Sequence, residues 1–256
     1  MNKDISKTIA EQAWFKGWFD SRFYHHLYAN RDEQEARDFI DSLLKWLKPS
    51  PVARMLDLGC GRGRHSKHLA SQGFDVTGID LAASSIEVAK MQPQDNLRFY
   101  RQDMRLPFGE RTFDFVFSFF TSFGYFDSTH DDNLVIENIA SSLCAGGSIV
   151  IDYINSPYAE KRLKKNEVVD MDGIIYQIDR WTSDSHFYKK ITIRESLFGD
   201  PLSYTEKIKK FTVEDFGELF SAHGLTLKKV FGNYRLDSYD LQSSPRMILI
   251  GEKQSR

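Results

Sequence analysis

The sequence predicts an α/β fold with a Rossmann-like, doubly wound, seven-stranded and mostly parallel sheet, and three observations support this prediction. Short apolar segments alternate with helical segments between residues 54 and 153, a pattern typical of parallel strands joined by crossover helices. The first apolar segment ends in a glycine-rich loop, and the next one ends in an acid about twenty residues further on. Near the C-terminus, a helix and two more apolar segments follow.

The predicted elements follow from hydrophobic periodicity and from breaker residues. Residues 11–48 favour helices, and Pro49 and Pro51 end the last of them. The first five strands of the sheet are expected at Arg54–Leu58, Asp75–Ile79, Leu97–Arg101, Phe113–Phe120 and Ser148–Tyr153. Helices are expected at Arg64–Gln72, Ser84–Met91, Leu134–Leu143 and Val213–His223, and the last two strands at Leu225–Phe231 and Met247–Ile250 as an antiparallel hairpin.

The domain organisation is predicted from where this alternation stops. Residues 1–50 are interpreted as an N-terminal helical lid segment, and residues 51–256 as the main domain. Within the main domain, polar and apolar residues alternate at 173–178, 187–194 and 202–208. Such alternation is typical of half-buried antiparallel strands, so we expect an antiparallel β insertion at about residues 160–210, after the fifth strand.

The composition excludes several classes of protein. The chain has 256 residues, 41% of them hydrophobic, and a net charge of −2, which gives no basic field for nucleic acid. We expect no membrane association, because no run approaches the roughly eighteen apolar residues needed to span a bilayer, and no secretory signal, because residues 1–11 lack an apolar stretch. Cys60 and Cys144 are far apart in the chain, so we expect no disulfide between them. The absence of an expected disulfide favours a reducing cytoplasm. His65 and His68 are expected on a solvated helix face, and we expect no metal site.

The glycine loop, Gly59-Cys60-Gly61-Arg62-Gly63, departs from a dinucleotide-binding fingerprint. That fingerprint requires a small residue where this chain has Arg64, and an acid, Asp57, precedes the first glycine. Asp57 repels phosphates but suits an ammonium group, or it fixes the loop backbone. Asp80 stands where an acid accepts hydrogen bonds from ribose hydroxyls. A ligand with an amino-acid end and a ribose end fits this arrangement better than a pyrophosphate.

With these residues, the segment from about 53 to 155 resembles class I S-adenosylmethionine-dependent methyltransferases, whose first motif reads much like residues 57–63. The resemblance implies S-adenosyl-L-methionine as cofactor and S-adenosyl-L-homocysteine as product. It also implies cofactor contacts, with Cys60 offering backbone groups, Asp103 and Met104 meeting the adenine, and Tyr28 in a lid. The cofactor residues expected in all are Asp57, Gly59, Cys60, Gly61, Gly63, Asp80, Leu81, Asp103, Met104, Phe119 and Tyr28.

The segment after the fourth strand is unusually aromatic, and in this fold it faces the transferable methyl group. We therefore expect Phe120, Phe123, Tyr125 and Phe126 in the acceptor pocket, where aromatic rings also attract cationic groups. Tyr125 and His130 are the candidate catalytic residues, with His130 as a general base for an amine acceptor.

The predicted function is methyl transfer from S-adenosylmethionine to a small molecule, an amine, a phenol or an acid, by in-line displacement. Three alternatives remain open: a methyltransferase acting on tRNA or protein, a non-catalytic cofactor-binding scaffold, and a nicotinamide oxidoreductase. The chain is expected to be a monomer or a homodimer. The sequence does not identify the acceptor.

Overall fold

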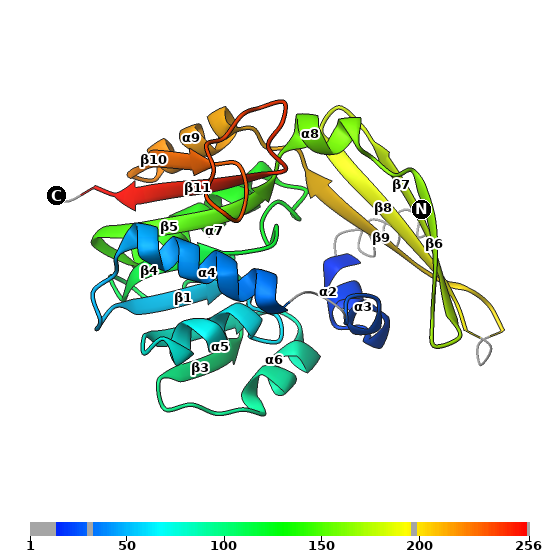
Figure 1. Cartoon of the computed structure of the whole chain (residues 1–256), viewed down its shortest axis with the longest axis horizontal. Coiled ribbons are helices and arrows are strands. Elements are labelled where there is room, and N and C mark those ends of the chain that lie inside the picture. The colour runs from blue at the N-terminus through cyan, green and yellow to red at the C-terminus, as the bar shows by residue number, and fades with distance from the viewer. Residues whose placement is uncertain (1–13, 30–32, 196–198, 255–256) are drawn as a thin grey trace, which may run out of the picture. The chain divides into compact units, whose positions relative to one another are not determined.

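The computed structural model describes residues 14–29, 33–195 and 199–254, which belong to two compact units (Figure 1). The larger unit comprises Asp32–Phe123, Ser128–Tyr158 and Phe211–Arg256. The smaller unit comprises the described residues of Met1–Arg31, Gly124–Asp127 and Ala159–Lys210. The N-terminal residues 1–13, for which we expect no secretory signal, lie outside the described residues.

The larger unit contains a seven-stranded sheet in the order β10-β11-β5-β4-β1-β2-β3. Strand β11 runs antiparallel to both of its neighbours, and the other pairs are parallel, which confirms the predicted fold class. The strands are β1 (Arg54–Leu58), β2 (Asp75–Asp80), β3 (Leu97–Arg101), β4 (Phe113–Ser118), β5 (Leu143–Ile154), β10 (Leu225–Phe231) and β11 (Arg246–Lys253).

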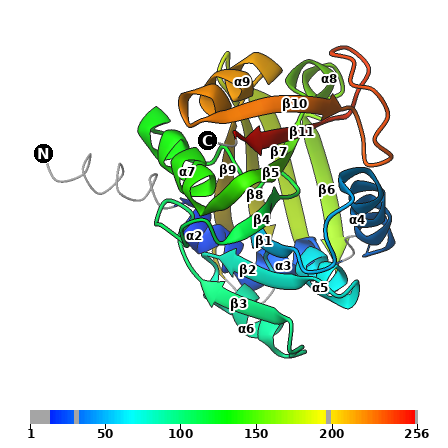
Figure 2. The same ribbon diagram turned by 90° about the vertical axis from the view of Figure 1, so that its left-hand side faces the viewer.

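Helices cover both faces of this sheet. Figure 2 shows α4 and α5 on one side and α7 on the other. The helices are α4 (Glu33–Leu47), α5 (Arg64–Ser71), α6 (Ala83–Lys90), α7 (Thr129–Ser142) and α9 (Val213–Ala222). Phe39, Ile40 and Leu43 of α4 are buried in the same apolar core as Met55 of β1. Because the apolar face of α4 is buried in this way, the helix belongs to the larger unit.

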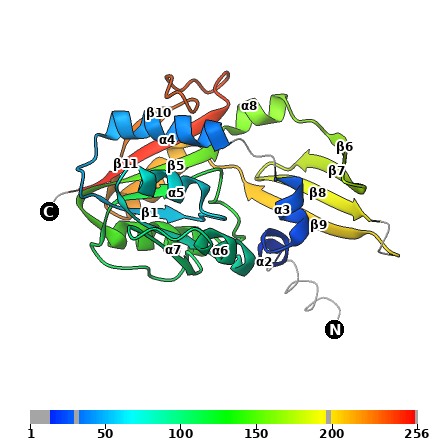
Figure 3. The same cartoon turned by 60° about the horizontal axis from the view of Figure 1, so that its bottom comes forward.

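The smaller unit contains a four-stranded antiparallel sheet, in the order β6-β7-β8-β9. Its strands are β6 (Asn166–Met171), β7 (Ile174–Thr182), β8 (His186–Arg194) and β9 (Leu202–Lys209). The short helices α2 (Trp14–Phe19) and α3 (Arg22–Leu27) lie next to β8 and β9 in Figure 3. Trp18 and Phe23 are buried with Tyr176 and Ile191 on one face of this sheet. The antiparallel insertion after the fifth strand is therefore present, and α8 (Ser156–Lys161) leads into it.

The structure differs from the sequence prediction in several places, and β4 ends at Ser118 instead of Phe120. The division between the units falls near residue 31 rather than residue 50, because α4 packs on the larger unit. Helix α7 begins at Thr129 instead of Leu134, since Ser128 caps it by accepting a hydrogen bond from the backbone N–H of His130. The edge strand β6 was not predicted, because its alternation is short and Val168 on it is exposed.

Candidate functional site

The glycine loop follows β1 and leads into α5. Gly59, Gly61 and Gly63 have positive φ angles of 75°, 54° and 78°. A Cβ atom at Gly59 would lie 2.6 Å from Cβ of Ser122, and one at Gly63 would lie 2.4 Å from the ring of Phe99. A Cβ atom at Gly61 would meet nothing within 4 Å. The outer glycines are therefore required by packing, whereas the middle glycine faces open space in which a ligand can approach the backbone.

Asp80 is the last residue of β2, and its side chain hydrogen-bonds the backbone of the glycine loop. Its Oδ2 atom accepts a hydrogen bond of 2.8 Å from the backbone N–H of Gly61, and its Oδ1 atom accepts one of 2.8 Å from the N–H of Ala82. A carboxylate oxygen has two lone pairs, so each oxygen of a carboxylate can accept more than one hydrogen bond. Asp80 thus fixes the middle of the loop and has the chemistry to accept hydrogen bonds from a pair of hydroxyl groups.

Asp57 lies beneath the loop and is 1% exposed. The hydroxyl of Ser66 donates a hydrogen bond of 2.5 Å to its Oδ2 atom. Burial raises the pKa of Asp57 to about 7, and the nearby Asp80 adds to the increase while the bond from Ser66 opposes it. The carboxyl group therefore resists ionisation until a positive charge, such as an ammonium group, compensates its desolvation.

Asp103 follows β3 and forms a bidentate ion pair with Arg105. Nε and Nη2 of Arg105 donate to the two carboxylate oxygens of Asp103 at 3.0 and 2.7 Å, and Nη1 donates to Asp131 at 3.2 Å. These acids raise the pKa of Arg105. Met104 and Leu81, both partly buried, lie in the segments that follow β3 and β2. The ends of these strands therefore carry the residues expected to meet an adenine.

The aromatic segment after β4 contacts the beginning of α5. The ring of Phe119 is 3% exposed and lies 4.6 Å from the His65 ring and 5.2 Å from the Phe117 ring. Phe120 is partly exposed, and its ring faces the guanidinium group of Arg64 at 5.0 Å. Phe119 is thus mainly a packing residue, whereas Phe120 presents its ring beside the residue that follows the glycine loop.

Phe123, a predicted pocket residue, is buried, whereas His130, a predicted catalytic residue, is exposed. Phe123 is 1% exposed and packs against Phe211 and Phe216 at 5.5 and 5.6 Å in the larger unit. His130 is exposed in the first turn of α7 rather than in a loop. These two predictions stay predictions, and the burial of Phe123 means that a substrate contact requires its ring to move.

Tyr125 and Phe126 belong to the smaller unit. The ring of Tyr125 lies 5.7 Å from Trp14 and 5.2 Å from Phe19, and Phe126 lies 5.8 Å from Phe15. They form an aromatic cluster with α2. The predicted acceptor residues are therefore divided between the two units.

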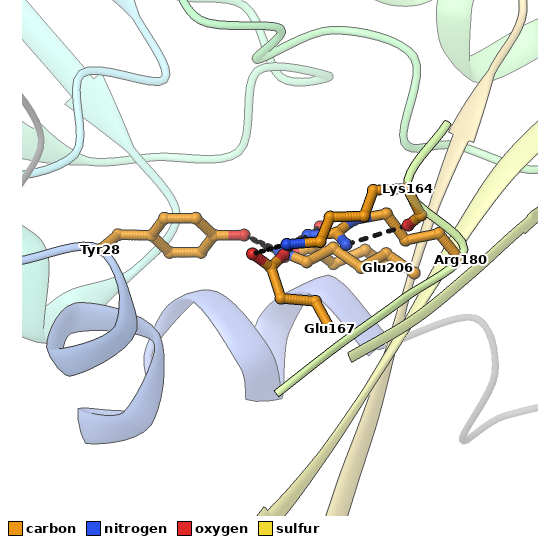
Figure 4. A network of polar contacts seen from close by, with 6 residues as sticks. Tyr28, Lys164, Glu167, Arg180 and Glu206 are labelled. Carbon is orange, nitrogen blue, oxygen red and sulfur yellow. Dashed lines mark hydrogen bonds and ion pairs between the residues drawn. The ribbon is translucent and has the colours of Figure 1, made fainter. Parts of the chain in front are cut away.

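Tyr28, the expected lid residue, lies at the end of α3 and is directed at Glu206 of β9 (Figure 4). Its hydroxyl donates to Glu206 at 3.2 Å, and Trp18 Nε1 donates to the same oxygen at 2.7 Å. Lys189 contacts the Tyr28 hydroxyl and lies 3.7 Å from Glu206. Glu206 therefore ties both α2 and α3 to the sheet, and Tyr28 takes part in this polar contact.

The expectation that His65 and His68 lie on a solvated helix face is wrong. His65 is 7% exposed, and the side chain of His68 is 14% exposed with its Nε2 atom 2.7 Å from Asp41. Asp41 lies on α4, which covers this face of α5. Cys60 is also buried, and burial raises the pKa of its thiol, so backbone groups are the part of this residue available to a ligand.

Three contributors to this region were missed from the sequence. Ser66 bonds Asp57, Arg105 bonds Asp103, and Asp152 of β5 bonds the backbone of Phe120 at 2.8 Å. The sequence contained a signal for the role of Asp152, because this residue is the single acid within the apolar segment 149–153. A charge at such a position is rarely buried without a partner.

Across residues 14–29, 33–195 and 199–254, no group of three or more His, Cys, Asp or Glu side chains is arranged to hold a metal ion. Within those same ranges, no helix is long and apolar enough to cross a membrane.

Residues 55–147 match the family model described as a methyltransferase domain. That segment contains the glycine loop, Asp80 and Asp103. The match identifies this segment as a methyltransferase domain, and the sheet order and the solved structures of similar fold agree with the fold of S-adenosylmethionine-dependent methyltransferases.

Comparison with individual proteins agrees with this assignment. The chain is 27% identical to the putative methyltransferase YqeM of Bacillus subtilis over 87% of its own length and 94% of that protein. It is 34% identical to the ubiquinone biosynthesis O-methyltransferase of Coxiella burnetii over 49% of its own length and 64% of that protein. It shares its fold, with a TM-score of 0.66 and 20% identity, with CalS10 of Micromonospora echinaspora, described as an amino pentose methyltransferase. That alignment covers 91% of this chain and 96% of CalS10.

Proposed function

We propose that this chain methylates a small-molecule acceptor and that its larger unit binds S-adenosylmethionine at the glycine loop. The observation that carries the proposal is the geometry at Gly61. The loop is open at Gly61 while its neighbours are closed by packing, and the Asp80 carboxylate is fixed beside the opening. A ligand that lies against a glycine backbone and offers hydroxyl groups to an acid fits this arrangement.

The roles proposed for the residues follow from their surroundings. Asp80 accepts hydrogen bonds from the ribose hydroxyls, and Asp57 compensates the ammonium group of the methionine end. Asp103 and Met104 lie where the adenine is expected, as does Leu81. Glycine backbone at Gly61 allows the cofactor to approach closely. S-adenosylmethionine supplies, when bound, a methyl group on a sulfonium centre that an acceptor takes by in-line displacement.

The chain contributes to this reaction chiefly by alignment. Holding two reactants in a productive geometry is worth up to roughly 7–11 kcal/mol in favourable cases. Phe120, beside the start of α5, is the partly exposed ring best placed in the larger unit to bound the acceptor. Its π-face attracts a cationic or amine-bearing group.

A small-molecule acceptor is supported by charge and by the related proteins. The net charge of −2 provides no general attraction to nucleic acid. The relatives described above include one named as an O-methyltransferase and one described as an amino pentose methyltransferase, which we take to suggest hydroxyl and amino-sugar acceptors for this chain. Both acceptor classes therefore belong in the test, together with carboxylic acids.

The experiment has a binding step and a transfer step. The purified chain is titrated by calorimetry with S-adenosylhomocysteine, and NAD serves as the control. We expect micromolar binding of the first compound and none of the second. The chain is then incubated with labelled S-adenosylmethionine and separate panels of amines, phenols, carboxylic acids, bulk tRNA and protein. Label transfer confined to tRNA or protein contradicts the proposal, and binding without transfer to any panel contradicts its catalytic part.

A further inference from the structure

The segment between β4 and α7 contains a backbone turn that side chains far away in the sequence hold in place. Phe120 and Thr121 are consecutive non-glycine residues with positive φ angles of 58° and 61°. Left-handed backbone is unfavourable for residues that carry a Cβ atom, and most of all for a β-branched residue such as threonine. A pair of such residues persists only where the surrounding structure enforces the conformation.

The enforcing group is Asp152, which is 0% exposed on β5. Its Oδ2 atom accepts a hydrogen bond of 2.8 Å from the backbone N–H of Phe120, and its backbone carbonyl accepts one of 3.0 Å from the N–H of Thr121. The same residue therefore holds both members of the left-handed pair. Its side chain and its main chain act on adjacent peptide groups.

Two further side chains hold Asp152 itself. Arg246 of β11 donates from Nε to its Oδ1 atom at 2.7 Å, with Nη2 at 2.6 Å from the same oxygen, and it also donates from Nη2 to the hydroxyl of Thr121 at 2.8 Å. The hydroxyl of Tyr234 donates to Oδ2 of Asp152 at 3.0 Å. Burial and the negative charge of Asp152 raise the pKa of Tyr234, so this hydroxyl keeps its proton and remains a donor. We call Asp152, Tyr234 and Arg246 the turn clamp.

The other side of the turn touches the glycine loop. The hydroxyl oxygen of Ser122 lies 2.8 Å from the carbonyl oxygen of Phe119 and 3.3 Å from that of Gly59, so its single proton can be donated to either carbonyl. A side chain at Gly59 would collide with Ser122, which shows how closely the two segments approach. At the same time the Phe120 ring lies 5.0 Å from the guanidinium group of Arg64, at the start of α5. A change in the backbone of the turn is therefore expected to alter contacts at both ends of the glycine loop.

We infer that the turn clamp is a positioning device for the cofactor site, and that Asp152 is its central positioning residue. It acts by holding the strained Phe120–Thr121 backbone so that Ser122 and Phe120 set the glycine loop. The clamp itself is not placed in contact with substrate. This inference rests on the proposed function, because its readout is the affinity of the glycine loop for a cofactor product.

The test compares two tyrosines of the same connection between β10 and β11. Tyr234→Phe removes the hydroxyl that bonds Asp152, whereas Tyr239→Phe removes a hydroxyl that bonds Asn155 at 3.2 Å and does not touch the turn. Both substitutions delete one tyrosine hydroxyl and leave the ring. We expect Tyr234→Phe to weaken S-adenosylhomocysteine binding by about fivefold to tenfold, in line with one lost hydrogen bond, and Tyr239→Phe to weaken it less than twofold.

A rescue experiment separates positioning from general stability. Glycine adopts positive φ without a Cβ penalty, so Thr121→Gly makes the turn less dependent on the clamp. We expect the double variant Tyr234→Phe/Thr121→Gly to bind S-adenosylhomocysteine within about twofold of Thr121→Gly alone, because a relaxed turn no longer needs the lost bond. Arg246→Lys, which keeps the charge but loses the paired donors, should show a loss larger than that of Tyr234→Phe. Thermal melts of every variant show that binding is measured on folded protein.

The outcomes are distinct. If wild-type protein does not bind S-adenosylhomocysteine, the proposed function fails. If wild-type protein binds but Tyr234→Phe and Tyr239→Phe have equal affinities, the turn clamp has no positioning role. If Tyr234→Phe weakens binding and the double variant binds S-adenosylhomocysteine more than about twofold more weakly than Thr121→Gly alone, the loss has another cause and the inference is overturned.

Discussion

The buried carboxyl group of Asp57 makes a quantitative prediction about how stability depends on pH. Its side chain lies under the glycine loop, bonded to Ser66, and its pKa is raised from 3.8 to about 7, mainly by burial. Asp57→Asn is the perturbation, because asparagine has nearly the same shape and its carbonyl oxygen still accepts the Ser66 hydrogen bond. The variant removes only the group that titrates.

The sign follows from proton linkage. Between the unfolded pKa of 3.8 and the folded pKa of about 7, the folded protein holds the Asp57 proton more tightly than the unfolded chain does. Stability contributed by the neutral acid is therefore lost as the pH rises through this window. With these pKa values, the penalty amounts to about 2 kcal/mol at about pH 5.5 and about 4 kcal/mol at about pH 8.

Asparagine carries no such penalty at either pH. We therefore expect Asp57→Asn to gain about 2 kcal/mol relative to wild type between the lower and the higher pH. For a chain of this size, that gain corresponds to roughly 4–8 °C in melting temperature. The assay is thermal unfolding of both proteins at the two pH values, without ligand.

A matched control is Asp75→Asn on β2, whose half-exposed carboxylate pairs with Arg98 at 2.5 Å. Exposed ion pairs contribute little, so this variant should follow the wild-type pH dependence. The reasoning is refuted if Asp57→Asn and wild type change in parallel between the two pH values. It is also refuted if the Asp75 control reproduces the Asp57 effect.

Three further predictions concern other parts of the chain. Asp80→Ala should weaken S-adenosylhomocysteine binding more than about tenfold by calorimetry, because it leaves hydroxyl groups without acceptors; unchanged affinity would exclude the proposed role. Gly61→Ala should lower the free energy of unfolding by about 1 kcal/mol, as should the control Gly224→Ala at another open left-handed position. Only Gly61→Ala should abolish S-adenosylhomocysteine binding. If both variants bind normally, the opening at Gly61 is not the cofactor site. Glu206→Gln should lower the free energy of unfolding by about 1 kcal/mol in urea, because it removes the charge that faces Lys189, and an unchanged midpoint would contradict the anchoring of α2 and α3.

Much of the larger unit could be predicted because its signals are local. Strands β1, β3 and β10 begin and end at the residues predicted, since each is a short apolar segment bounded by turns or charges. Helix α7 was predicted too short, because its first turn, Thr129–Asp132, has no apolar periodicity and depends on the Ser128 cap. Strand β5 starts at Leu143, before the glycine pair at 146–147 where we expected the strand to be entered.

The position of Asp80 could also be predicted from a local signal, because the spacing between a glycine loop and an acid at the end of the next strand is visible in the sequence. The surroundings of its neighbour Asp57 could not be predicted in this way. Burial raises the pKa of Asp57 and the hydrogen bond from Ser66 opposes the increase, and composition gives no measure of either effect. The contact of His68 with Asp41 likewise depends on α4, which was assigned to a separate lid segment.

The turn clamp shows most clearly where local reasoning ends. Asp152 bonds Phe120, Tyr234 and Arg246, which are 32, 82 and 94 residues away in the chain. The antiparallel register of β11 on β5 pairs Asp152 with Ile248, and Arg246 then lies diagonally across on the same face. A strand shifted by one residue would turn Arg246 to the opposite face and leave the Asp152 charge buried without its cation. The predicted hairpin at the end of the chain therefore does more than complete the sheet, because its register determines whether the turn beside the glycine loop is held.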